Sequence, residues 1–143
     1  MSVDPRGELI VYTDGGARGN PGPAACGVVI KTNDGRTVKR FGRYLGQTTN
    51  NQAEYQGLIA ALEEAHRLGV TIVRCHLDSE LLVKQMKREY RVKNKGLQPL
   101  FLKAWNLAAL FKQVTFVHIP REQNREADAE VNKALDEAMA RGV

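Results

Sequence analysis

Residues 9–22 read LIVYTDGGARGNPG, an apolar run that leads directly into a carboxylate and then into small residues. Leu9 to Tyr12 are typical of a buried strand. An Asp-Gly pair is a strong signal for a tight hairpin. However, the eight residues after Gly15 contain three Gly and two Pro, a composition that disfavours a paired strand. We therefore predict that Asp14 ends a central strand in a Gly-rich loop, where its charge can serve chemistry.

The rest of the chain is predicted to alternate strands and helices in the order β-β-β-α-β-α-α-β-α. Strands are expected at 8–13, 25–33, 37–46, 71–79 and 114–120, and helices at 48–69, 80–90, 97–112 and 124–140. Short turns between the first three strands predict antiparallel pairing, and helices between the later strands predict parallel pairing. The sequence thus predicts one α/β domain over residues 1–143, with a five-stranded mixed sheet and helices on both faces.

The composition favours a protein that binds a polyanion. The chain has 21 Lys and Arg against 16 Asp and Glu, which gives a net charge of +5, and a basic balance of this kind suits nucleic acid. Cys26 and Cys75 lie in apolar segments without a CxxC partner, so we expect reduced core thiols and a cytoplasmic protein. No apolar run is long enough to span a membrane, the N-terminus does not resemble a signal peptide, and no obligate protein partner is evident.

Four acidic residues occupy comparable places in four predicted elements. Asp14 and Asp78 end apolar strands, while Glu54 and Asp128 fall in the first turns of helices. Each has a simpler explanation: Glu54 could close a capping box with Asn51, Asp78 could cap the next helix, and Asp128 could complement a helix dipole. Taken together the four are better explained as one site, because strand ends and helix starts converge at one edge of an α/β sheet.

Four carboxylates at one edge would repel one another, and burial would raise their pKa values. A divalent metal ion relieves both effects. Oxygen-only ligands select Mg²⁺ or Mn²⁺ over zinc. Two such ions can activate a water molecule and stabilise the leaving oxygen of a phosphodiester. The acids therefore predict a two-metal phosphodiester hydrolase.

Four stretches carry a resemblance to a known family. They read YTDGGARGNPGPAACGVVI, TTNNQAEYQGLIAALE, LDSELLVKQM and REQNREADAEVNKAL. In this order and spacing they resemble ribonuclease H of type 1, from about residue 8 to residue 140. The resemblance implies the ribonuclease H-like fold. It also implies endonucleolytic cleavage of the RNA strand of an RNA–DNA hybrid, with 3′-hydroxyl and 5′-phosphate products.

The resemblance also implies roles for individual residues. Asp14, Glu54, Asp78 and Asp128 match the metal-binding carboxylates of the family. Positions expected to contact the hybrid are Gly15, Asn20, Thr49, Asn50 and Asn51. Small residues after Asp14 would let a nucleic-acid backbone approach closely, and Asn side chains can both donate to and accept from a ribose 2′-hydroxyl. Asn50 and Asn51 could instead serve only to cap the helix, for which Asn50 is the predicted N-cap.

The sequence departs from the family pattern in two places. Many members carry a His in a loop before the last carboxylate, and residues 121–127 contain none. His118 falls in a predicted strand, where we expect it to be packed, so Arg121 is the candidate for a phosphate contact in that loop. Some members also have a long basic protrusion after the third carboxylate. Here a compact segment carries the basic residues, namely Lys84, Lys87, Arg88, Arg91, Lys93 and Lys95, which form either a reduced phosphate grip or a solvated helix face.

Two alternative functions keep parts of this interpretation. Integrases and resolvases share the fold and use similar carboxylate chemistry on DNA, but the first two motifs favour the ribonuclease. A hybrid-binding module without catalysis is the other alternative. Four intact acids argue against it, because acids that repel phosphate would not serve binding alone.

Overall fold

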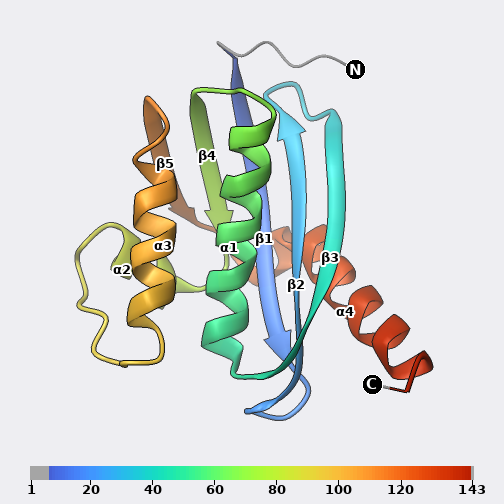
Figure 1. Ribbon diagram of the computed structural model, residues 1–143. Coiled ribbons are helices and arrows are strands. Elements are labelled where there is room, and N and C mark those ends of the chain that lie inside the picture. Colours follow the sequence, from blue (N-terminus) through green and yellow to red (C-terminus); the bar gives the residue numbers. More distant parts are fainter. Residues whose placement is uncertain (1–6, 143) are drawn as a thin grey trace.

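The computed structural model describes residues 7–142 and has the predicted element order (Figure 1). The strands are β1 (Glu8–Ala17), β2 (Gly22–Thr32), β3 (Thr37–Thr48), β4 (Ile72–Leu77) and β5 (Gln113–His118). The helices are α1 (Asn50–Arg67), α2 (Glu80–Met86), α3 (Gln98–Ala108) and α4 (Arg125–Ala140), with a 3-10 turn η1 (Arg121–Gln123) before α4.

The five strands form one mixed sheet in the order β3-β2-β1-β4-β5. β1 pairs antiparallel with β2, as β2 does with β3, whereas β4 pairs in parallel with β1 and β5. This is the ribonuclease H-like arrangement, and it confirms the predicted mixture of antiparallel and parallel strands. β1 lies in the centre of the sheet between β2 and β4, and it contacts both α1 and α4.

The prediction that β1 ends at Asp14 is wrong. β1 continues to Ala17, and its residues after Asp14 still pair with β2, where Ala17 lies opposite Ala24. Only the parallel pairing with β4 stops, at Thr13 and Leu77. The turn that follows β1 is confined to residues 18–21, so the small residues after Asp14 lie in a ladder rather than in a loop.

Helices cover both faces of the sheet (Figure 1). The larger core lies between the sheet and α1, α2 and α3, and it includes Leu9, Val11, Tyr55, Leu58 and Leu62. A smaller cluster, formed by Ala25, Val131, Ala134 and Leu135, joins α4 to the other face.

The start of α1 differs from its prediction by one residue. Thr49, not Asn50, is the N-cap, because its hydroxyl accepts a hydrogen bond from the Gln52 backbone N–H at 3.2 Å. The Gln52 side chain accepts in return from the Thr49 N–H, which completes a capping box. Glu54 takes no part in this capping box, so helix capping does not account for this acidic residue.

Glycines allow both helices to lie very close to the sheet. A Cβ atom built at Gly15 in β1 would stand 2.2 Å from the Ala53 carbonyl carbon of α1. A Cβ atom at Gly27 in β2 would stand 2.2 Å from the Ala127 carbonyl oxygen of α4. Because no real side chain tolerates such distances, these glycines set how closely α1 and α4 approach the strands.

The remaining global expectations concern the thiols and the membrane. Cys26 and Cys75 are both buried and free, as expected for core thiols. No helix within residues 7–142 is long and apolar enough to cross a membrane.

Candidate active site

The four predicted acids line one open cleft at the C-terminal end of the parallel strands. The cleft has a volume of about 460 Å³. Asp14 comes from β1, Glu54 from the first turns of α1, Asp78 from the residue after β4, and Asp128 from the first turn of α4. Residues that are far apart in the sequence are thus brought together, as predicted.

The close contact at Gly15 places Glu54 beside Asp14. The Ala53–Glu54 peptide of α1 lies directly over Gly15, so a Cβ atom there would also stand 2.4 Å from the Glu54 backbone nitrogen. Gly57, one turn further along α1, lies against the Asp14 backbone carbonyl. The predicted role of Gly15 was a close approach of nucleic acid. Gly15 does line the cleft, but the approach that the structure shows is that of α1.

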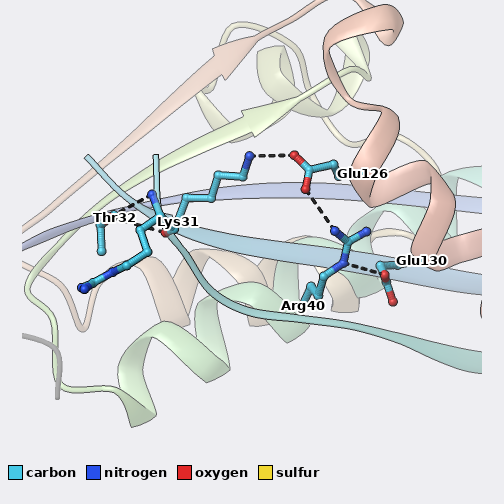
Figure 2. A network of polar contacts seen from close by, with 6 residues as sticks. Lys31, Thr32, Arg40, Glu126 and Glu130 are labelled. Atoms are coloured by element: carbon cyan, nitrogen blue, oxygen red, sulfur yellow. Dashed lines mark hydrogen bonds and ion pairs between the residues drawn. The ribbon is translucent and has the colours of Figure 1, made fainter. Parts of the chain in front are cut away.

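Ion pairs fix the helix that carries Asp128 (Figure 2). Lys31 of β2 pairs with Glu126 at 2.6 Å, and Arg40 of β3 reaches Glu126 at 3.1 Å and Glu130 at 2.8 Å. Glu126 and Glu130 flank Asp128 on α4. The start of α4 is therefore held on the sheet on both sides of the acidic residue.

The environment of Asp14 disfavours its charge. Burial raises the pKa of Asp14 to about 8, with further contributions from the nearby Asp78 and Asp128 carboxylates. A hydrogen bond from the Gly15 N–H to Asp14 Oδ1, at 2.9 Å, opposes this shift only in part. In the absence of a cation, the charged form of Asp14 is therefore disfavoured.

Glu54 is in a similar state. Burial raises its pKa to about 7; a hydrogen bond from Ser79 lowers it, and the charge of Asp78 raises it further. Its Oε2 atom is buried and has no hydrogen-bonding partner among the described residues. A buried, unpaired carboxylate oxygen in a cluster of acids is an unfavourable arrangement that a divalent cation would relieve.

The acids fit Mg²⁺ or Mn²⁺, but they do not form a closed cage. Within residues 7–142, no three His, Cys, Asp or Glu side chains are arranged to hold a metal ion by themselves. Mg²⁺ commonly binds to one or two carboxylates and completes its shell with water and substrate phosphates. An open, oxygen-lined cleft is compatible with that mode of binding.

The predicted substrate contacts fall into two groups. Gly15, Asn50 and Arg121 line the cleft with the acids, whereas Asn20, Thr49 and Asn51 do not. Asn50 Oδ1 accepts from the Ala17 N–H at 2.8 Å, and the Asn50 N–H donates to Asn20 Oδ1 at 3.1 Å. Asn20 therefore supports Asn50, which itself lines the cleft. The contacts of all six with a hybrid stay predictions.

Sequence reasoning missed three residues with polar side chains that line the cleft, namely Arg18, Ser79 and Asn132. Ser79 caps α2 through the Leu82 N–H at 3.2 Å and also bonds to Glu54; its position between a strand and a helix was the available signal. Asn132 lies one turn after Asp128 and donates to the Asp128 carbonyl at 3.2 Å. Arg18 pairs with Asp136 of α4 at 2.7 Å.

The two departures from the family pattern also have structural outcomes. His118 is exposed at the end of β5, so the prediction that it is packed is wrong. In the basic segment, Lys84 pairs with Glu80 at 2.9 Å. Arg88 instead lies over the stacked rings of Phe101 and Trp105, at 5.7 and 5.3 Å from the ring centres.

The sheet order and the acid-lined cleft together define a ribonuclease H-like protein, and comparisons with known proteins narrow this class. Residues 12–134 match a family described as reverse transcriptase-like. Ribonuclease HI of Halobacterium salinarum is 42% identical over 96% of this chain and 69% of its own length. A bifunctional protein of Mycobacterium tuberculosis is 42% identical over 92% of this chain, and the match spans only 36% of that longer protein.

Solved structures agree with these relatives. The crystal structure of the Halobacterium ribonuclease H1 superposes with a TM-score of 0.89 at 41% identity, over 92% of this chain and 99% of that one. LC11 ribonuclease H1, isolated from compost, was crystallised with an RNA/DNA hybrid and superposes with a TM-score of 0.87 at 46% identity, again over 92% and 99%. The chain belongs to the ribonuclease H1 family.

Proposed function

We propose that this chain is a metal-dependent endoribonuclease that hydrolyses the RNA strand of RNA–DNA hybrids. One observation carries the proposal: Asp14, Glu54, Asp78 and Asp128 line a single cleft, where burial and the neighbouring carboxylates raise the pKa values of Asp14 and Glu54. The binding of a hybrid by the similar LC11 ribonuclease H1 supports the choice of substrate.

The four carboxylates would hold two Mg²⁺ or Mn²⁺ ions, with water and substrate phosphates completing their coordination. When bound, these ions supply a reactive water and neutralise charge on the phosphodiester. Water adds to phosphorus and the bond to the ribose 3′-oxygen breaks, which leaves a 3′-hydroxyl and a 5′-phosphate. The chain's own contribution is to hold the acids at the end of a rigid sheet, so that little reorganisation is needed during the reaction.

Residues around the acids orient the hybrid. Arg121 is exposed and lines the cleft together with Asp128. Its guanidinium group suits a phosphate contact rather than a proton transfer. Asn50 has one side-chain oxygen bonded to Ala17, which leaves its amide group to donate to the ribose 2′-hydroxyl. These contacts would make RNA the cleaved strand.

The basic segment supplies part of the grip on the duplex. A hollow of about 720 Å³ is lined by Arg88, Arg91 and Lys93 together with Phe101. Arg88 is held in place by its ring contacts, and Lys84 is excluded because it is paired with Glu80. Binding of the duplex by this segment therefore depends on fewer basic residues than the six that the sequence contains there.

The test is cleavage of end-labelled substrates by the purified protein in Mg²⁺, in Mn²⁺ and in EDTA. We expect cuts within the RNA strand of a hybrid only when metal is present, and little cutting of a DNA duplex of the same sequence. Equal rates on the two duplexes would contradict the proposal and favour a DNA-directed nuclease. Binding of the hybrid without any cleavage in either metal would favour a binding module.

A further inference from the structure

Asn124 is an unusual interior residue. Only 1% of its surface is exposed, which places this polar side chain among the most buried in the described chain. It lies immediately before α4, four residues ahead of Asp128. Its side chain is absent from the wall of the cleft, so a direct contact with substrate is not available to it.

The side chain joins two elements that each carry a cleft acid. Asn124 Nδ2 donates a hydrogen bond to the Thr13 backbone carbonyl at 2.8 Å. Thr13 precedes Asp14 and is the last residue of β1 that pairs with β4. On the other side, the Asn124 carbonyl accepts from the Asp128 backbone N–H at 3.1 Å, in the first turn of α4. One residue thus connects the backbone next to Asp14 to the backbone of Asp128.

This use of Asn124 departs from the usual role of asparagine at a helix start. Asn is among the best N-cap residues because its side-chain oxygen accepts from a free backbone N–H of the first turn. In the described structure the Asn124 side chain makes no such bond to α4. Its Oδ1 atom is buried without a hydrogen-bonding partner among residues 7–142. An apolar residue would avoid that cost, so the amide serves the link to β1.

We propose that Asn124 is a positioning residue of the active site, which fixes the placement of Asp128 relative to Asp14 and thereby sets the affinity of the site for divalent metal. The inference rests on the proposed function for its metal chemistry. Residues that orient metal ligands typically change metal affinity or activity by about ten- to a hundredfold when they are replaced.

The test compares Asn124→Leu, which keeps most of the volume and removes the donor, with Val73→Ala. Val73 is fully buried in β4 and pairs with Leu9, toward the opposite end of the parallel ladder from Leu77. Its truncation lowers the thermal midpoint through a cavity and leaves the cleft alone. Asn124→Ala, which cannot overpack, is the second variant if Asn124→Leu does not fold. All measurements are made well below every midpoint.

The first readout is binding of Mn²⁺ alone, measured by calorimetry without substrate. We expect both Asn124 variants to bind Mn²⁺ about ten- to a hundredfold more weakly than wild type and Val73→Ala to bind normally. The second readout is cleavage, where kcat should fall and the required metal concentration should rise. KM for the hybrid should stay unchanged, because a buried side chain does not touch the duplex.

Two results separate the positioning role from the proposed function. If the Asn124 variants bind Mn²⁺ and cleave as Val73→Ala does, Asn124 is structural only and the inference is overturned. If wild type binds Mn²⁺ but cleaves no hybrid, the proposed function is wrong, while weakened Mn²⁺ binding in the variants would still support the positioning role.

Discussion

Replacing Asp14 by Asn separates what this acid contributes to cleavage from what it costs the folded protein in stability. The Asn side chain keeps an oxygen to accept from the Gly15 N–H but removes a carboxyl whose charge is disfavoured by burial and by two neighbouring acids. We expect Asp14→Asn to abolish cleavage in Mg²⁺ and, without metal, to make the protein more stable near neutral pH.

The magnitude follows from the shift in pKa. The pKa of Asp14 is about 8 in the fold and 3.8 in its ordinary range. The raised pKa costs nothing below 3.8, where the carboxyl is protonated in both folded and unfolded chains. The cost grows as pH rises and is complete only above about 8. Between the ordinary pKa and pH 7 lie about three pH units. The raised pKa therefore lowers the free energy of unfolding at pH 7 by at most about 4 kcal/mol. For a domain of this size that is about 10 °C in thermal midpoint.

The assay is thermal unfolding in EDTA at several pH values, together with cleavage in Mg²⁺. The advantage of Asp14→Asn over wild type should be near zero at pH 3.5, and it should grow steadily up to pH 8. Added Mg²⁺ should stabilise wild type and not the variant. Near wild-type cleavage by the variant would refute the two-metal assignment. A variant that is less stable at pH 7 in EDTA would refute the view that repulsion and burial strain this site.

Three further predictions address other parts of the molecule. Mg²⁺ affinity should rise steeply with pH up to about 8 and then level off, because bound carboxylates must lose protons whose pKa values are about 8 and about 7; calorimetry in two buffers checks this. Gly15→Ala should lower the free energy of unfolding, measured in urea, by about 1–3 kcal/mol. It should also slow cleavage, because α1 must shift and carry Glu54 with it. Gly16→Ala is the control and should do neither, because a Cβ atom there meets nothing closer than 3.8 Å. Replacing Lys87, Arg88 and Arg91 together with Ala should weaken hybrid binding and leave kcat unchanged. The plot of log affinity against log salt concentration should become shallower, by the equivalent of up to about three phosphate contacts. Unchanged binding across a salt series would make the segment a solvated face.

The sequence was sufficient for the sheet and for the convergence of the acids, because both depend on patterns within single elements. Alternating strands and helices determine which strands pair in parallel, and the C-terminal ends of those strands meet at one edge. Asp78 and Asp128 could be placed by this reasoning alone. The N-cap of α1 was predicted one residue late, at Asn50 instead of Thr49, because both are good caps and only the reciprocal bond with Gln52 decides between them.

What could not be predicted depends on contacts between elements. The Gly and Pro content after Asp14 suggested a loop, but Gly15 is required by the backbone of α1, and the strand continues because β2 supplies a partner as far as Ala24. The role of Asn124 could not be predicted either, since nothing in the local sequence reveals its bond to Thr13, 111 residues away. His118 was expected to be packed, and only the edge position of β5 explains its exposure.

The distribution of the acids over four elements has a consequence for how the protein becomes active during its synthesis. The acids stand at positions 14, 54, 78 and 128, and the last one is held in place by β2, β3 and β1. A nascent chain that has not yet released α4 from the ribosome can form much of the sheet but lacks the fourth acid and its support. Under the proposed function, cleavage would therefore begin only after α4 has packed on the sheet, so that the onset of activity would report the folding of the whole domain.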